Sequence, residues 1–357
     1  MNLKEKYVLR QDELRHIAAL FDGYKNLADN PKNCQPMVIV YVPEENVPGW
    51  ERRLNDPLCM LETQLKRNRQ HLSMGDDFIP ATRVEFGTAQ IAAAFGCEIY
   101  TPPNNLPAAG SHILENIEDI KALEPPTLAD GWFPRLFSYI SLFLDNTPDG
   151  DVMQLPDIQS AFNSAHLIRG NDILLDFYDD PEALDELFRK ITNFMVLATK
   201  ELNRVIGAEE GWFLDWGMLW KGAARISNCS MHMISPDFYR DYILPHDKRF
   251  FDETGGGRIH YCGTSHDVIR DFLTLEKLSG LDVDAGLHDI RQLAKATPEH
   301  VVLTNTPNSK LPEDMINRML DGDFPEKRNM IFHLHAQDVE SGKALYYSMK
   351  NAISKAM

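Results

Sequence analysis

The sequence is poor in basic side chains. Its 357 residues include 36 lysines and arginines against 53 aspartates and glutamates, which gives a formal charge of −17 at neutral pH. A surface this acidic does not suit phosphate neutralisation, so we expect no nucleic acid partner. Long apolar runs are missing as well, since no stretch approaches the roughly 18 apolar residues of a membrane-spanning helix. We therefore expect no membrane partner, and look for a small-molecule substrate.

Cysteines are few, odd in number and widely spaced. The chain has five: Cys34, Cys59, Cys97, Cys229 and Cys262. This spacing does not suit a disulfide framework. The first residues, MNLKEKYVLRQDELRH, are rich in charge and lack the apolar segment of a secretory signal. We therefore expect a cytoplasmic protein with reduced thiols.

Several common functional motifs are also missing. No Gly-x-Gly-x-x-Gly follows an expected strand, and the chain has neither a Walker lysine loop nor a Gly-x-Ser-x-Gly elbow. These absences argue against nucleotide binding and serine hydrolysis. What is present is an ordinary globular composition, 43% hydrophobic and 25% charged, which is enough for a large core.

Short apolar runs recur along the chain between longer helical patterns. Their residue ranges are 37–42, 78–84, 152–155, 211–216, 258–262, 280–283, 301–304 and 330–335. Eight such runs alternating with helices predict an α/β protein of one domain, residues 1–357, built as a (β/α)8 TIM barrel with strands from about 37 to 335. A helical extension precedes the barrel, and the proline-rich segment 102–107 is expected to extend over its mouth.

Three helices have clear boundaries or spacing. Asp180 stands as a cap before Pro181, and apolar residues then recur at helical spacing to Leu202. A second helix opens at Ser235 with the same kind of start, and Pro245 is expected to end or kink it. The last helix begins at about Gly342.

The segment Arg258-Ile259-His260-Tyr261-Cys262-Gly263 carries the strongest chemical signal. Side chains alternate along a strand, so His260 and Cys262 share one face, about 7 Å apart at roughly 3.3 Å per residue. In a barrel this pair lies at the C-terminal end of a strand, where catalytic groups collect. Imidazole and thiolate suit zinc. The alternative is a buried cysteine in apolar packing beside a histidine bonded to a backbone carbonyl.

The eighth run supplies two further histidines. In Met330-Ile331-Phe332-His333-Leu334-His335 the alternation places His333 and His335 on one face, with His335 nearer the mouth. A third metal ligand could therefore come from this strand, with His335 as the candidate. Both histidines could instead be core or rim groups that satisfy their own hydrogen bonds.

Five other side chains are candidates for the mouth of the barrel. Asp215 ends the fourth run and is a candidate for proton transfer, while Cys229, Asn305, His266 and Glu85 are candidates for substrate binding. Each also has a structural interpretation: packing for Cys229, turn chemistry for Asn305, a helix cap for His266, and a solvated loop charge for Glu85.

Four segments resemble the uroporphyrinogen decarboxylase superfamily. They are VEFGTAQIAAAFGCEIY at 84–100, DIQSAFNSAHLIRGNDILLDFYDDPEALDELFRKI at 157–191, SPDFYRDYILPHDKRF at 235–250 and IHYCG at 259–263. The first is similar to a segment common in an uncharacterised bacterial branch. Together they cover most of the chain from about residue 75 onward. The resemblance implies a TIM barrel.

Two chemistries accompany this resemblance. The superfamily's decarboxylases act on a tetrapyrrole without metal and hold it with an arginine-rich N-terminal motif and an aspartate at the mouth. The segment with the first expected strand, MVIVYVPEENVPGW at 37–50, contains no arginine. The related cobalamin-dependent methyltransferases hold zinc with a His-x-Cys pair, which His260 and Cys262 match, and a later cysteine. No cysteine follows Cys262 here. The corresponding strand ends in His335, which decarboxylases also carry at this point.

The leading hypothesis is a zinc-dependent methyltransferase. His260, Cys262 and His335 hold Zn²⁺, and a thiol-type acceptor exchanges a methyl group with a corrinoid or folate carrier. A separate corrinoid carrier protein and a homodimer are compatible with the resemblance. One alternative is a metal-free carboxy-lyase in which His335 and Asp215 move protons. Another is a corrinoid- or tetrapyrrole-binding protein without turnover.

Overall fold

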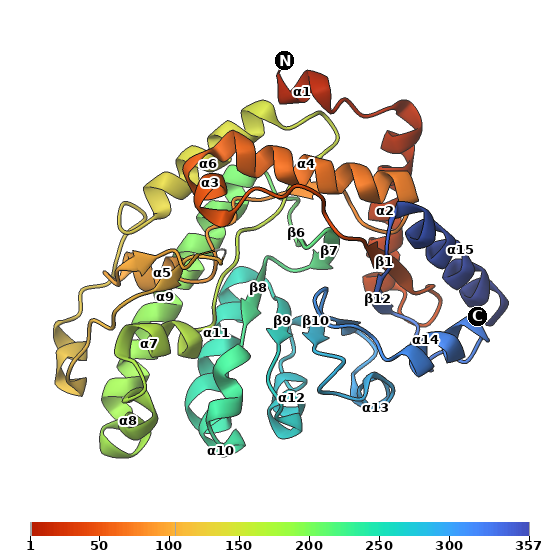
Figure 1. Cartoon of the computed structure of the whole chain (residues 1–357). Coiled ribbons are helices and arrows are strands. Elements are labelled where there is room, and N and C mark those ends of the chain that lie inside the picture. The colour runs from red at the N-terminus through yellow and green to blue at the C-terminus, as the bar shows by residue number, and fades with distance from the viewer. Residues whose placement is uncertain (1, 104, 357) are drawn as a thin grey trace.

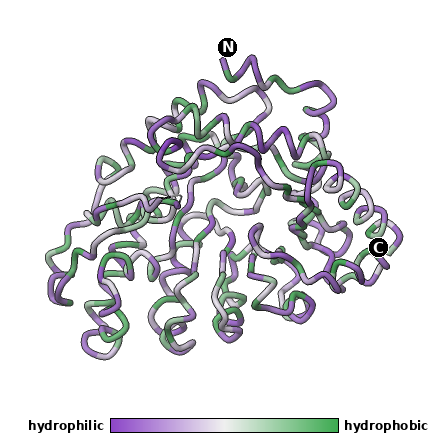
Figure 2. The backbone as a smooth tube through the Cα atoms, in the orientation of Figure 1, coloured by the Kyte–Doolittle hydropathy of each residue, from purple (hydrophilic) through white to green (hydrophobic). Residues whose placement is uncertain are grey.

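The protein is an α/β molecule with parallel strands at its centre and helices outside them (Figure 1). The computed structural model describes residues 2–103 and 105–356. In Figure 2 the outer helices alternate between hydrophilic and hydrophobic stretches, as helices with one face on a core do. None of the helices in the described residues has the length and apolar character needed to span a membrane.

The sheets of the described residues are formed by twelve strands. They are β1 Met37–Tyr41, β2 Ala81–Thr82, β3 Ile99–Tyr100, β4 Ala108–Ala109, β5 Val152–Met153, β6 Trp212–Asp215, β7 Met218–Lys221, β8 Ala224–Ser227, β9 Gly257–Tyr261, β10 Leu278–Val283, β11 Val302–Asn305 and β12 Met330–His335. Seven of the eight expected runs contain a strand of the parallel system, so the period-2 pattern located these strands well.

Six strands make one parallel sheet in the order β1-β12-β11-β10-β9-β8. Its register decides which side chains meet. Across β8, β9 and β10, Ser227 pairs with His260, and His260 pairs with Asp282. Asp282 therefore lies directly beside the histidine that the sequence singled out, although 22 residues separate the two in the chain.

The strands β2 and β5 form a separate parallel pair. Backbone hydrogen bonds connect segments next to this pair to both edges of the six-stranded sheet. On one side Asp77 N donates to Val38 O at 3.0 Å, and on the other Ser160 N donates to Ser227 O at 3.1 Å. The eight parallel strands thus follow one another in space, but the hydrogen-bonded ladder is not continuous around a closed ring.

The fourth expected barrel strand was placed wrongly. The run 211–216 contains β6, which pairs antiparallel with β7 in a hairpin, and the parallel neighbour of β9 is β8, which the sequence analysis missed. Both residues of the connecting turn, Trp216 and Gly217, have positive φ angles, 52° and 70°, as a type I′ turn requires. A Cβ on Gly217 would lie 2.2 Å from the ring of Phe78, so only glycine fits there.

In the part of the chain that the structure describes, fifteen α-helices surround the strands. They are α1 Leu3–Lys6, α2 Gln11–Asp29, α3 Trp50–Asn55, α4 Pro57–Met74, α5 Gln90–Ala94, α6 Phe133–Asn146, α7 Ala161–Arg169, α8 Ile173–Asp179, α9 Pro181–Ile206, α10 Pro236–Phe238, α11 Leu244–Thr254, α12 His266–Phe272, α13 Ile290–Ala296, α14 Glu313–Leu320 and α15 Val339–Ala356. The first two precede β1 and form the expected helical extension.

Helix α9 begins where the sequence predicted. The side chain of Asp180 accepts a hydrogen bond from Ala183 N, which caps the helix, and Leu184, Leu187 and Ile191 are fully buried. The helix that opens at Ser235 continues beyond Pro245, but the residues Tyr239–Ile243 form a π-helical segment between α10 and α11. This irregular segment ends just before the proline, where the regular hydrogen-bond pattern cannot be kept.

The excursion between the second and third expected strands forms a small hairpin. Strands β3 and β4 pair antiparallel, and the predicted loop, of which Asn104 lies outside the described residues, connects them. Leu106 of this loop lines the cavity described below. The segment between β2 and β5 therefore contributes to the wall of that cavity.

Candidate metal centre and adjoining cavity

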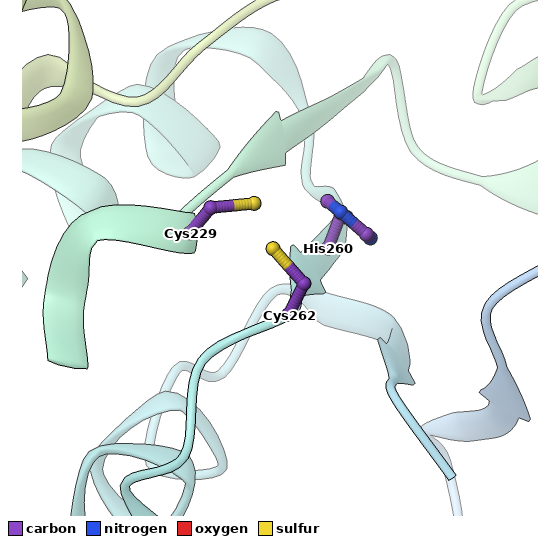
Figure 3. A group of neighbouring side chains, drawn as sticks. All are labelled: Cys229, His260 and Cys262. Carbon is purple, nitrogen blue, oxygen red and sulfur yellow. The ribbon is translucent and has the colours of Figure 1, made fainter. Parts of the chain in front are cut away.

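Three side chains capable of binding a metal converge at the C-terminal ends of β8 and β9. One donor atom each from Cys229, His260 and Cys262 lies within 4.8 Å of the other two. Figure 3 shows the two sulfur atoms turned toward each other beside the imidazole ring. Within residues 2–103 and 105–356 no second group of three histidine, cysteine or acidic side chains comes this close.

Strand pairing brings Cys229 to the His-x-Cys pair. His260 lies in β9 and Cys262 follows that strand by one residue, while Cys229 follows β8 by two residues. The backbone N of Asn228 donates to the carbonyl of His260 at 2.9 Å, so the two strand ends stay in register. The side chain of Asn228 also donates to the buried Asp247 of α11 at 2.8 Å, which anchors this corner.

Asp282 holds the imidazole of His260. Its carboxylate contacts Nδ1 of the ring, so Nδ1 carries the donated proton and Nε2 remains for another ligand. Burial lowers the pKa of His260, but the Asp282 carboxylate outweighs burial and the net shift is upward. A histidine whose orientation and tautomer are set by a carboxylate is a common arrangement at metal sites.

The two thiols differ in acidity. A hydrogen bond from Cys229, with His260 nearby, lowers the pKa of Cys262 to about 5, so Cys262 is the thiolate of the pair at neutral pH. The hydrogen bond to the Cys262 sulfur and burial raise the pKa of Cys229. Zinc binds thiolates and neutral imidazole, so the Cys229 thiol would release its proton on binding the metal.

Asp282 is the first member of a buried network of ion pairs in which arginines and aspartates alternate. Arg258 is fully buried and bridges Asp282 to Asp215, and Arg225 bridges Asp215 to Asp157. Arg83 closes the chain with contacts to Asp157 at 2.8 Å and to Asp215 at 3.1 Å. Asp215, a candidate for proton transfer, is therefore engaged with three guanidinium groups inside the molecule.

A cavity of about 720 Å³ lies close to His260, although none of the three converging side chains lines it. Trp216 connects the two features, because it lines the cavity and its ring contacts the His260 ring edge-on with centroids 5.3 Å apart. The guanidinium groups of Arg225 and Arg258 each lie 4.8 Å from the Trp216 ring, which holds this wall in place.

Two of the expected site residues line this cavity. They are His335, at the end of β12, and Glu85. The ring of His335 lies 5.8 Å from that of Tyr41, another lining residue, and burial lowers the pKa of His335. His335 thus contributes to the cavity wall and is not part of the convergent group, in which Cys229 supplies the third donor.

Two other candidates lie apart from both features. Asn305 is buried, its amide donates to the carbonyls of His333 and Ser309, and its side-chain oxygen accepts from His333 N, so it links β11 to β12. His266 is exposed at the start of α12 and its Nδ1 lies 3.3 Å from Nδ1 of His288. Neither is among the residues that line the cavity.

The sequence analysis missed Asp282, Arg258 and Arg225. The signal that could have found them is charge within apolar strands, since a charged side chain in a buried strand needs a partner. Arg258 and His260 occupy the same face of β9, and Asp282 interrupts the apolar run of β10.

Comparison with known proteins agrees with the motif resemblance. The sequence profile of the family described as "Uroporphyrinogen decarboxylase (URO-D)" matches residues 77–306, more than half of the chain. The chain belongs to the uroporphyrinogen decarboxylase family. This member of the family carries the Cys-His-Cys group in addition to the family fold.

Two proteins from methanogens are similar to this family member. It is 23% identical over 237 residues to methylcobamide:CoM methyltransferase MtbA of Methanosarcina acetivorans, and the match spans 63% of each chain. The solved structure of a methyltransferase from Methanosarcina mazei superimposes with a TM-score of 0.67 over 93% of this chain and 97% of that one. At 15% identity the second match shows that the fold is shared.

Proposed function

We propose that this chain is a zinc-dependent methyltransferase, which transfers a methyl group between a corrinoid or folate carrier and a thiol-type acceptor. The observation that carries the proposal is the convergence of Cys229, His260 and Cys262, with the histidine oriented by Asp282. The similarity to a relative named as a methylcobamide:CoM methyltransferase supports the same chemistry.

The residues present fit zinc. Two sulfurs and one imidazole nitrogen are a donor set of the kind that holds Zn²⁺ with a fourth position left for a substrate. Cys262 is exposed, so the group opens to solvent. We propose Cys229 as the third ligand in place of His335, because its sulfur already lies with the other two donors.

Zinc held by Cys229, His260 and Cys262 would act as a Lewis acid, which would lower the pKa of an acceptor thiol. Asp282 keeps the proton on Nδ1 of His260 and so leaves Nε2 for the metal. The acceptor sulfur forms a bond to the methyl carbon, and the electron pair of the broken bond stays with the donor. Trp216 and the adjoining cavity hold the rest of the small molecule next to the reacting sulfur.

We also infer the complete architecture and its partner. The eight parallel strands and their helices are proposed to form one (β/α)8 barrel domain, in which the metal-binding residues lie at the mouth formed by the C-terminal ends of the strands. A corrinoid-carrying protein would dock at this open end. The cytoplasm is the proposed location, because Cys262 and Cys229 must stay reduced to bind metal.

The proposal is tested by metal content. We expect about one zinc per chain in purified protein, measured by mass spectrometry of the metal, and its loss in Cys229→Ser, His260→Ala and Cys262→Ser. Cys59→Ser is the matched control, because Cys59 lies in α4 outside the convergent group, and this variant should keep its zinc. The zinc-loaded protein should transfer methyl groups from methylcobalamin or methyltetrahydrofolate to a thiol.

Three outcomes would count against it. Protein that carries no zinc, takes none up and yet is fully active would remove the metal from the mechanism. Release of carbon dioxide from a carboxylated tetrapyrrole by metal-free protein would identify a carboxy-lyase instead. Tight corrinoid binding by zinc-loaded protein with no transfer to any thiol would favour a binding protein.

A further inference from the structure

The cavity next to the metal-binding residues contains two arginines without hydrogen bonds. Arg53 of α3 and Arg67 of α4 both line it, and Figure 1 shows these two helices crossing the same end of the molecule. Among the side-chain hydrogen bonds of the described residues none comes from either guanidinium, and Nε of each is buried without a hydrogen-bond acceptor. A guanidinium has five N–H donors, so these side chains, 10% and 26% exposed, keep most of their hydrogen-bonding capacity for a ligand or water.

Arg53 is the more deeply buried of the two. Its residue surface is 9% exposed, and its guanidinium stacks on the Trp50 ring at 3.5 Å. Its one acidic neighbour in an ion pair is Glu85, at 3.8 Å from Nη1, which is beyond hydrogen-bond distance. Burial lowers the pKa of Arg53, as expected for a cation that has lost water without gaining a close partner.

Arg67 and Glu85 have the same loose geometry. Arg67 lies 3.8 Å from Glu85 through Nη2. Its Nε lies 3.3 Å from the Glu44 carboxylate but without the alignment of a hydrogen bond. Arg83 approaches Glu85 no closer than 3.7 Å. Glu85 therefore has three guanidiniums around it and accepts a hydrogen bond from none of them. Glu85 supplies negative charge to these three arginines but accepts none of their hydrogen bonds.

Arg83 shows what a satisfied arginine looks like in the same cavity wall. It donates to Asp157 at 2.8 Å and to Asp215 at 3.1 Å. Asp157 is thus already engaged, both by Arg83 and by Arg225. The donors left over in the cavity belong to Arg53 and Arg67, and the exposed Lys310 adds a further positive charge to its lining.

We propose that Arg53 and Arg67 form an oxyanion-binding site and that Glu85 is its resident counter-ion, which the oxyanion of an incoming ligand displaces. The ligand is a small molecule with a carboxylate, sulfonate or phosphate group. The assignment of this ligand to the methyl-transfer substrate rests on the proposed function, whereas the anion site itself does not depend on zinc. Glu85, a candidate for substrate binding, becomes a competitor of the substrate.

The physical reason is the difference between a charge contact and a hydrogen bond. A guanidinium presents a planar fork that matches the oxygens of a carboxylate, sulfonate or phosphate, and paired N–H···O contacts of about 2.8 Å are much stronger than contacts at 3.8 Å. An oxyanion between Arg53 and Arg67 would gain these hydrogen bonds. Glu85 lowers the net charge of the empty site, so it reduces the cost of burying two cations and also weakens the binding of anions.

The test is a calorimetric titration of the metal-free full-length protein with inorganic phosphate, acetate and methanesulfonate at low ionic strength. We expect binding of at least one of these anions, and Arg53→Gln and Arg67→Gln should weaken it about tenfold or more. Arg53→Lys should bind with intermediate affinity, because it keeps the charge and loses the fork. The matched control is Arg52→Gln, which removes an exposed arginine of the same helix and should leave affinity unchanged.

The decisive variant is Glu85→Gln. It removes one negative charge at nearly constant volume, so anion affinity should rise about fivefold or more. Unchanged or weaker binding in Glu85→Gln would overturn the role of Glu85, and unchanged binding in Arg53→Gln and Arg67→Gln would overturn the site. Should Arg53→Gln fail to fold, Arg67→Gln and Glu85→Gln decide. The cysteine variants that lose zinc should still bind the anion. A failure of the proposed function can therefore be told apart from a failure of this anion site.

Discussion

At the scale of single residues, the arrangement of Cys229, His260 and Cys262 depends on a contact with a fourth residue, Asp282. Asp282 is completely buried and accepts from Nδ1 of His260, while Arg258 and Arg225 keep the pKa of Asp282 low despite burial. The histidine is therefore held in one orientation before any metal arrives. Such preorganisation reduces the entropy that metal binding must overcome.

This contact yields a prediction. Asp282→Asn should weaken zinc binding about 10- to 100-fold, because an amide orients the imidazole less strongly and makes it a poorer ligand. Competition with a coloured chelator measures the affinity. Asp284→Asn changes a carboxylate two residues further along the chain and serves as the control. Equal affinity in Asp282→Asn and unaltered protein would show that the ring is positioned by something else.

The sequence pattern predicted two of the three converging side chains and missed the third. His260 and Cys262 share a face because side chains alternate along β9, and this was predictable from six residues of sequence. Cys229 belongs to the end of β8, a strand that the pattern did not identify. No local rule relates it to Cys262, 33 positions away, because the strand register brings the two together.

At the scale of elements, α11 is linked to the site through a buried carboxyl group. Asp247 accepts from Asn228 Nδ2 at 2.8 Å and from the Tyr239 hydroxyl at 3.0 Å. Asn228 immediately precedes Cys229, and Tyr239 begins the π-helical segment. One side chain thus connects a helix, the irregular segment before it and the end of β8.

Burial raises the pKa of Asp247 to about 7, so the folded protein binds this proton more tightly than the unfolded chain does. Because the folded-state pKa lies above the unfolded value of 3.8, the contribution is complete below pH 3.8 and is lost as pH rises to 7. The loss is on the order of 4 kcal/mol. Asp247→Asn should make the unfolding free energy less dependent on pH between 4 and 7, as measured by urea denaturation.

A matched control for this variant is Asp145→Asn, since Asp145 is exposed near the end of α6. It should keep the slope of the unmodified protein. A slope in Asp247→Asn equal to that of the control would mean that Asp247 is ionised in the folded protein at pH 4. Asparagine can accept the same two hydrogen bonds through its Oδ1, so large destabilisation at low pH is not expected.

At the scale of the whole molecule, the interior of the strand system is held by charges as well as by apolar packing. Arg258 is 0% exposed and joins β9 to Asp215 of β6 and Asp282 of β10. These contacts connect the hairpin to the six-stranded sheet. Removal of the cation would leave two buried carboxylates with fewer partners.

We therefore expect Arg258→Met to lower the unfolding free energy by about 3–5 kcal/mol, which urea denaturation would detect as a lower midpoint. Arg204→Met provides the comparison, because Arg204 makes an ion pair with Glu201 on the exposed side of α9 and should cost less than about 1 kcal/mol. Similar losses in the two variants would argue against the buried network as a source of stability.

The sequence by itself determined the class of the fold, most of the strands, the start of α9 and the pairing of His260 with Cys262. All of these depend on periodicity and on capping residues that are neighbours in the chain. The tertiary structure alone decided the third donor, the carboxylate that orients the histidine and the arginines that face Glu85. Their contacts join residues from different strands and helices, and only strand order and register, which local patterns do not encode, bring such residues together.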